Sequence, residues 1–387
     1  MRVIFYNLLL LTIFLMFGAV VGEVYLRYDG RYADLVNANL IRSRAIWDRP
    51  ANVTQYRKHP DLDINVEIIF NDFNIRNHQG ISLQDVEEYQ GNLIGVFGDS
   101  MTENRRVEDK YTFTSLLNEI LSPGHTVLNF GVDGYGLDQS YMKYLDFKQH
   151  KKLKHVFYVF MSNDLRNIYE NQLFDFDDNE LGAPIPPEIN PFIDVVRQFH
   201  VSYLMLDSYA RLKAKIADET YATEEMDDKL ARNFSLRRLY KARKKRVHDE
   251  YADSIAKDYL SEKPTVQTLE WASRFKLLLS AWNDTVISNN SDFTILVVPS
   301  PGSTDLARKL FGEQFADNTV YLIDYFPEGY ENFTFENDNH WNETGNLRAM
   351  QAIANWGTNA KHWSFSNENL ANLTQKTEDA IKLLYKY

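Results

Sequence analysis

The sequence predicts an α/β protein of three layers, with a five-stranded, mostly parallel sheet between two layers of helices. Five short runs rich in β-branched and aromatic residues recur along the chain, at residues 93–97, 127–130, 156–160, 293–298 and 320–323. All five are apolar on both faces, as strands of a buried parallel sheet are. Three segments between them have the apolar spacing of crossover helices, at residues 111–121, 137–147 and 269–282. Strands that alternate with helices in this way form a layered α/β domain.

The composition limits the classes of function. With 387 residues, of which 44% are hydrophobic and 14% aromatic, the chain can bury a large core. It contains no cysteine, which excludes disulfides, thiol nucleophiles and thiolate metal sites. Its net charge of -12 argues against a nucleic-acid partner, because binding phosphates requires clustered Lys and Arg. Small or neutral substrates fit this charge better.

The amino-terminal segment, residues 1–27, predicts contact with a membrane. Residues 3–22 are uncharged and mainly aliphatic, and as a helix they would span roughly 30 Å, one hydrocarbon thickness. The segment is either a transmembrane anchor or a cleaved signal peptide. Its apolar run is longer than the usual signal core of about 7 to 15 residues, which favours the anchor. Arg2 and the terminal amine precede the apolar run, and Arg27, Arg31 and Arg42 follow it. The positive charge therefore does not support an amino terminus on the cytoplasmic side.

The rest of the chain divides around the predicted sheet. We expect a peripheral segment at residues 28–91, the main domain at 92–360 and a tail at 361–387. The spacing between the third and fourth runs is too long for one crossover, which predicts a helical insertion at about 165–264. Within it, residues 237–246 include seven Lys and Arg. These basic residues could contact an anionic lipid or an acidic polymer. We favour the alternative that they form a solvated face of a helix.

Residue types that can act together in nucleophilic catalysis follow the predicted strands. A serine follows the first strand, in residues 98–100, and glycines follow the second, in residues 131–136. An asparagine follows the third strand, in residues 162–164, and a histidine lies beyond the fifth, in residues 338–341. The carboxyl ends of parallel strands share one crevice, so these groups are expected to converge. A serine attacks once a histidine takes its proton, a carboxylate orients that histidine, and amides stabilise the resulting oxyanion.

At these four blocks the sequence resembles the SGNH, or GDSL-type, hydrolase family. The blocks read "GDSMTENRRVEDKYTFTSLL", "NFGVDGYG", "SND" and "NDNHWNETGN", and the resemblance covers about residues 92–356 without the insertion. It implies a flavodoxin-like fold with Ser100 as nucleophile, His340 as base and Asp338 as the acid that orients the base. It also implies an oxyanion hole of the Ser100 and Gly134 amides with the Asn163 side chain. No metal or other cofactor is implied.

The chain departs from the family pattern in two places. Met161 occupies a position where the third block usually has glycine, and Asn337 occupies the usual position of the acid, which is here Asp338. Either Asp338 completes a triad, as we favour, or a backbone carbonyl orients His340 in a dyad. The form Asp-x-His-Trp-Asn resembles membrane-associated members that move acyl groups on polysaccharides. This resemblance implies an acylated carbohydrate substrate and an exported domain, periplasmic or extracellular.

Each block also has a purely structural interpretation. Ser100 and Asn163 could cap helices, and Gly134 could serve only a turn. Asp99 fits a structural role better than a catalytic one, and the glycine cluster at 131–136 is not a dinucleotide fingerprint. Three functions remain open: an O-acyl (acetyl) esterase or O-acyltransferase on a carbohydrate, which we favour, a lipid-directed esterase, and a catalytically silent carbohydrate-binding or scaffold protein.

Overall fold

The computed structural model describes residues 2–29, 41–76, 80–177, 180–185, 199, 201–202, 204–205, 208, 250–326, 329–336 and 338–386. The chain forms two compact units, one of residues 1–42 and 188–243 and one of residues 43–187 and 244–387. The first unit contains helix α1 (Arg2–Asp29), in which residues Leu9–Tyr28 have a mean hydropathy of 2.2. This helix is long and apolar enough to cross a membrane, as both an anchor and a signal sequence would be.

The second unit is built on a sheet of five parallel strands in the order β6–β5–β7–β10–β11. In terms of the order along the chain this is 2-1-3-4-5, the flavodoxin-like arrangement. The predicted fold class is therefore confirmed, and each of the five apolar runs contributes a strand: β5 (Asn92–Phe97), β6 (His125–Asn129), β7 (Leu153–Phe160), β10 (Asp292–Val297) and β11 (Thr319–Tyr321). The fifth run is strand only to Tyr321, because its last two residues lie in a 3-10 helix.

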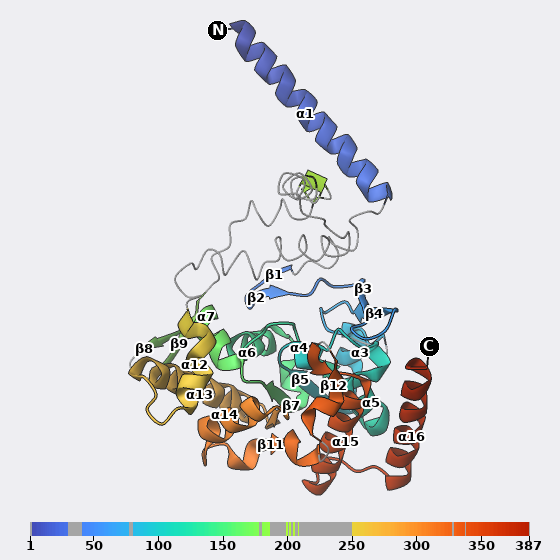
Figure 1. Cartoon of the computed structure of the whole chain (residues 1–387), viewed down its shortest axis with the longest axis vertical. Helices are drawn as coiled ribbons and strands as arrows, with labels where there is room; N and C mark the ends of the chain where they lie inside the picture. The colour runs from blue at the N-terminus through green and yellow to red at the C-terminus, as the bar shows by residue number, and fades with distance from the viewer. Residues whose placement is uncertain are drawn as a thin grey trace. The chain divides into compact units, whose positions relative to one another are not determined.

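Alternate side chains of the strands enter the two layers of helices. Phe157 and Val159 of β7 belong to the core beneath α5 (Phe113–Leu121), α15 (Glu343–Asn359) and α16 (Asn367–Leu384). Tyr158 and Phe160 point to the other face, where they contact Trp282 of α13 (Val266–Ser288) and Phe311 of α14 (Pro301–Phe311), with ring centroids 5.5 Å and 4.9 Å apart. Successive strand residues face opposite sides, so both layers pack against β7. Figure 1 shows α13 and α14 on one side of β7 and α5 and α15 on the other.

Local sequence explains where the crossover helices begin. The Thr112 and Thr265 hydroxyls each accept an amide hydrogen from the first turn of α5 and α13. Ser300 does the same for α14, which has proline at its first position, where no amide hydrogen is needed. The predicted helices at 111–121, 137–147 and 269–282 correspond to α5, α6 (Leu137–Asp146) and α13. Helix α13 continues past the prediction because Val286 extends its buried face.

The described part of the insertion is not purely helical. It begins with α7 (Asp164–Asn171) and ends with α12 (Glu250–Leu260), but an antiparallel hairpin of β8 (Phe174–Asp177) and β9 (Glu180–Pro184) follows α7. The expectation of a helical insertion is wrong for this hairpin. The β8 sequence FDFD alternates apolar and acidic residues, which is a strand pattern. The basic run at 237–246 lies outside the described residues.

Smaller elements of the second unit flank the sheet. Residues of the expected peripheral segment 28–91 form an antiparallel hairpin whose side chains Val66, Ile68 and Phe70 are buried. The other strands and α-helices of this unit are β2 (Ile46–Asp48), β3 (Val53–Lys58), β4 (Asn65–Phe70), α3 (Leu83–Glu88), α4 (Ser100–Glu103), β12 (Thr334–Phe335) and β13 (Asp338–Trp341). Strand β1 (Ile41–Ser43) contains residues of both units. The domain boundaries at 28, 92 and 361 stay predictions.

Deletion of residues 1–22 is expected to leave a folded, soluble protein, because α1 and the sheet belong to different compact units. Circular dichroism and gel filtration of the truncated chain test this. Loss of folding would contradict a separate anchor. Fractionation of the full chain is the companion measurement: a membrane-bound chain of full length supports the anchor, and a shortened soluble chain identifies a cleaved signal.

Candidate active site

Ser100 lies directly after the central strand β5, as the first residue of the short helix α4. The chain turns sharply at Gly98, which has φ +155°, and a side chain there would lie 2.4 Å from the Thr102 hydroxyl and 3.0 Å from the Val159 carbonyl oxygen. Only glycine fits this turn. Asp99 caps α4 by accepting the Met101 amide hydrogen at 2.9 Å. The helix cap is thus Asp99, and the interpretation of Ser100 as a cap is wrong.

His340 is held by the residues that follow it. It lies on β13, which pairs antiparallel with β12. Trp341 is fully buried and packs edge-on against Phe113, with ring centroids 5.8 Å apart. The Asn104 side chain, at the end of α4, donates to the Trp341 carbonyl oxygen at 3.3 Å. The buried tryptophan therefore fixes the short strand beside α4, which carries the serine.

The structure brings Ser100, His340 and Asp338 together in one hydrogen-bonded chain. His340 Nε2 lies 2.7 Å from Ser100 Oγ, and His340 Nδ1 is hydrogen-bonded to Asp338 Oδ1. The same carboxylate oxygen accepts the His340 backbone amide hydrogen at 3.0 Å. With a proton on Nδ1, the lone pair of Nε2 faces the serine hydroxyl. The arrangement can move a proton from Ser100 to His340 while Asp338 holds the ring.

Asp338 is kept ionised by its neighbours. Partial burial on its own would raise the pKa of the carboxyl. The hydrogen bond from His340 and the positive charge of Arg106 outweigh this effect and lower the pKa of Asp338 well below its ordinary value. Arg106 Nε donates to Asp338 Oδ2 at 3.1 Å. Both carboxylate oxygens are therefore bound, one by the histidine and one by the arginine.

The three expected oxyanion donors are all available for new hydrogen bonds. Ser100 opens α4, and amides in a first helical turn have no intrahelical acceptor. Gly134 has φ +77°, and no described residue accepts its amide hydrogen. Asn163 Nδ2 donates to Asp99 Oδ2 at 3.1 Å and keeps a second hydrogen. That the three donors serve one oxyanion stays a prediction.

Hydrogen bonds to Asp164 hold the Asn163 loop, in which a methionine replaces the usual glycine. The Met161 amide donates to Asp164 Oδ2 at 3.0 Å, and the buried Asp164 also accepts the Tyr158 hydroxyl hydrogen at 2.7 Å. Asn163 stands at the cap position of α7, but its side chain makes no capping hydrogen bond. A structural role as a helix cap therefore does not account for this side chain.

Replacing Asn163 by Ala is expected to lower ester turnover roughly 100- to 1000-fold, the usual loss for one oxyanion donor. Steady-state kinetics on a 4-nitrophenyl ester measure this. Ser162→Ala, in the same loop, is the matched control and should retain the parent rate. A loss below about threefold for Asn163→Ala would exclude the asparagine from the oxyanion hole.

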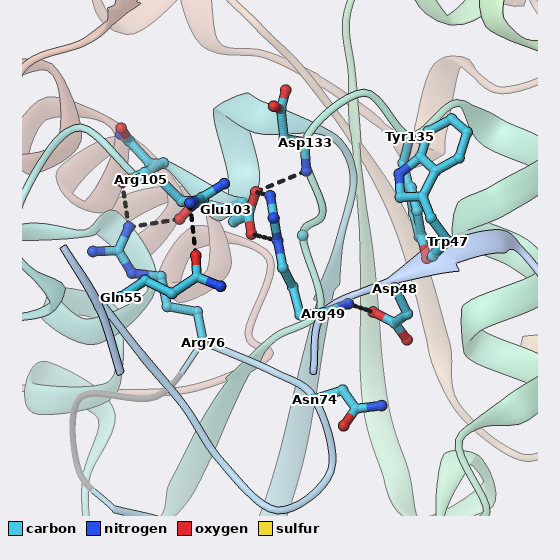
Figure 2. A network of polar contacts seen from close by, with 12 residues as sticks. Trp47, Asp48, Arg49, Gln55, Asn74, Arg76, Glu103, Arg105, Asp133 and Tyr135 are labelled. Carbon is cyan, nitrogen blue, oxygen red and sulfur yellow. Dashed lines mark hydrogen bonds and ion pairs between the residues drawn. The ribbon is translucent and has the colours of Figure 1, made fainter. Parts of the chain in front are cut away.

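A buried ionic network joins the serine helix to the glycine loop (Figure 2). Glu103, the last residue of α4, is fully buried and binds Arg49, with Arg49 Nη2 2.7 Å from its Oε2 oxygen. The same oxygen accepts the Asp133 backbone amide hydrogen at 2.7 Å. Arg49 and Glu103 thus fix the distance between Ser100 and the turn that contains Gly134. Burial alone would raise the pKa of Glu103, but the positive charge of Arg49 outweighs this effect. The pKa of Glu103 is therefore lowered from its ordinary value.

The sequence analysis did not identify these supporting residues. Arg76 is a further one: its guanidinium donates to the Glu103 and Val107 carbonyl oxygens at 2.7 Å and 2.6 Å. A signal was present, because the charged run Glu103-Asn104-Arg105-Arg106 follows the serine within six residues. Arg49 and Arg76 carry no such signal, since they come from the segment expected to be peripheral.

One group of described residues has the composition of a metal site, but it lies away from the serine. His155 and Asp292 are paired at the starts of β7 and β10, at the opposite end of the sheet from Ser100, and His362 joins them. Their potential ligand atoms lie within 4.8 Å of one another. His362 Nδ1 is 3.2 Å from Asp292 Oδ2, a distance that an ordinary hydrogen bond accounts for.

Comparisons with known proteins add little to this geometry. No family model matches the chain, and no curated protein matches its sequence. Among solved structures the chain is similar to the crystal structure of the lipase Lip_vut3 from a goat rumen metagenome. The identity is 13%, the match covers 69% of this chain and 97% of that chain, and the TM-score is 0.36. A similarity at this level carries no conclusion about activity.

Proposed function

We propose that this protein is a serine hydrolase of the SGNH type that acts on ester bonds, with an acylated carbohydrate as substrate. The observation that carries the proposal is the chain of hydrogen bonds from Ser100 Oγ through His340 to Asp338. The position of the serine directly after β5 supports the same proposal, as do the Ser100 and Gly134 amides, for which no described residue is the acceptor. These groups have the roles that ester hydrolysis requires.

In the acylation step, Ser100 Oγ attacks the ester carbonyl carbon while His340 Nε2 takes the hydroxyl proton. The carbonyl oxygen becomes an oxyanion, for which the Ser100 and Gly134 amides and Asn163 Nδ2 are the proposed donors. The intermediate collapses, the ester C–O bond breaks, and His340 returns the proton to the leaving alcohol. An acyl group then remains on Ser100, and His340 is again neutral.

The deacylation step decides between two reactions. If water attacks the acyl-enzyme, His340 takes a proton from the water and the protein is an esterase. If a sugar hydroxyl attacks instead, the acyl group moves to the sugar and the protein is an O-acyltransferase. The same residues serve both reactions. Preference for a carbohydrate, and for an exported domain held at a membrane by α1, rests on the family resemblance of the Asp-x-His-Trp-Asn block.

Two measurements test the proposal. A fluorophosphonate probe is expected to label the full chain at Ser100, because an activated serine attacks phosphorus and a scaffold protein does not. A panel of acetylated glycans, short acyl esters and lipid esters then assigns the substrate class. Absence of labelling, with no release of acid from any ester, would favour the catalytically silent scaffold. Turnover of lipid esters alone would favour the lipid-directed esterase.

A further inference from the structure

Three arginines, Arg57, Arg105 and Arg106, lie close enough to influence one another, and one of them contacts the acid of the candidate triad. Arg106 binds Asp338 directly, at 3.1 Å. Arg105, the preceding residue, is buried with 6% of its surface exposed. Arg57 lies on β3, two residues from Gln55 and on the same face of that strand, and Gln55 accepts a hydrogen bond from Arg105 Nη2 at 2.6 Å. The Gln55–Arg105 and Arg106–Asp338 hydrogen bonds thus connect strand β3 to the acid of the candidate triad.

Two of these arginines have no carboxylate partner among the described residues. Arg105 makes its hydrogen bond to the neutral amide of Gln55, and its Nε is buried without a partner. Arg57 is partly buried and makes no side-chain hydrogen bond or ion pair with a described residue. Arg106 uses Nε for Asp338, while its Nη1 is buried without a partner. A buried guanidinium normally has its donors satisfied, so this arrangement is unusual.

The neighbouring acids are already used by other groups. Glu103 is bound by Arg49 and by the Asp133 amide, and Asp338 is bound by His340 and Arg106. Asp133 contributes a negative charge that raises the pKa of Arg57 and of Arg105, but in both arginines burial and the neighbouring arginine charges outweigh it. Burial, and then the charges of Arg49 and Arg57, lower the pKa of Arg105 well below its usual value. Burial and then Arg106 lower the pKa of Arg57. An anion at this place would relieve both effects.

We propose that Arg57, Arg105 and Arg106 form a subsite for an anionic group of the substrate, a carboxylate or a phosphate close to the ester that Ser100 attacks. Guanidinium groups bind both anions through paired hydrogen bonds. The inference rests on the proposed esterase function and narrows its substrate class to acidic esters, such as acylated acidic sugars. The net charge of -12 favoured neutral substrates, but a net charge does not determine the sign of the charge at one site.

The subsite is tested by comparing aryl acetates that share one acyl group and differ in the charge carried by the leaving phenol. The neutral probe is methyl 3-acetoxybenzoate, and the anionic probes are 3-acetoxybenzoate and 3-acetoxyphenyl phosphate. The full chain is expected to hydrolyse at least one anionic probe with the higher kcat/KM. Arg57→Gln should reduce kcat/KM for that probe roughly 10- to 100-fold, through KM, and leave the neutral probe unchanged. The probe with the larger loss distinguishes carboxylate from phosphate.

Lys58→Gln is the matched control, because Lys58 is the next cation on β3 but faces solvent and pairs with Asp63. It should leave all three rates unchanged. Equal losses for Arg57→Gln on the neutral and anionic probes, or no preference for an anionic probe in the parent, would overturn the subsite.

A binding measurement separates the subsite from the esterase proposal. Calorimetry with the Ser100→Ala full chain and galacturonate oligomers reports affinity without turnover, and binding should weaken in the Ser100→Ala, Arg57→Gln double variant. Binding without turnover of any ester would support the subsite and contradict the esterase. Turnover of esters with neither a preference for the anionic probes nor binding of the oligomers would support the esterase and contradict the subsite.

Discussion

Replacing Ser100 by Ala is expected to lower ester turnover by several orders of magnitude, up to about 10⁶-fold, because no other hydroxyl occupies the place of the nucleophile. His340 Nε2 has its hydrogen-bond partner in Ser100 Oγ at 2.7 Å, and alanine leaves it none. The effect should appear in kcat, with the fluorophosphonate label lost at the same time. Steady-state kinetics and gel fluorescence of the variant measure both.

Folding of the Ser100→Ala variant should be nearly unchanged, since the hydroxyl contributes little packing at the end of a strand. Ser140→Ala provides the matched control. Ser140 lies on α6, is 1% exposed and has no hydrogen-bond partner for its hydroxyl among the described residues. It should keep both turnover and label. Retained turnover in Ser100→Ala with an unchanged melting temperature would mean that another residue is the nucleophile.

The predictable part of the fold was the part with a repeating pattern. Strand β7, for example, ends in the five apolar residues Val156–Phe160, and an apolar run of this length between turns is typical of a buried sheet. The crossover helices show the 3.6-residue period, and their starts carry Thr or Ser caps. Local patterns of this kind predict the fold because the faces that they make apolar are the faces that pack against the sheet.

The β8–β9 hairpin was missed for a different reason. Its strands are only four and five residues long, and the sequence FDFD is too short to be separated from a helix start by periodicity alone. The segments around it favour helix, and an alternation of four residues is too short to indicate a strand against them.

The candidate site also has residues that the sequence predicts and residues that it does not. Ser100 and His340 were found because their residue types are chemically specific and stand next to strand ends. Arg49, Arg57 and Arg76 were not, because nothing in the segment 28–91 ties an arginine to a residue more than 25 positions later. Such pairing is a property of the tertiary fold: Arg49 meets Glu103 across 54 positions only once the segment has packed against α4. Residue spacing carries no information about contacts of this range.

Asp338 provides the sharpest test of the catalytic arrangement, because it lies two residues before His340 and not three. Asp338→Asn is expected to lower turnover up to about 10⁴-fold, as in other triads in which an amide holds the wrong imidazole tautomer. The asparagine could donate to Nδ1 and so place the ring proton on Nε2, where it would face the serine hydroxyl and block its deprotonation. The bond from Arg106 would also lose its ionic partner.

The measurement is kcat and its pH profile for Asp338→Asn, with His340→Ala as the inactive reference. Asn337, the usual position of the acid, lies outside the described residues, and its replacement by Ala is expected to change little. Asn339→Ala is a second control, since its side chain is exposed between Asp338 and His340. If a backbone carbonyl oriented His340 instead, Asp338→Asn would keep most activity with little change in the pH profile. Turnover within tenfold of the parent, with His340→Ala inactive, would therefore leave a Ser100–His340 dyad, and Asp338 would serve only to shape β13.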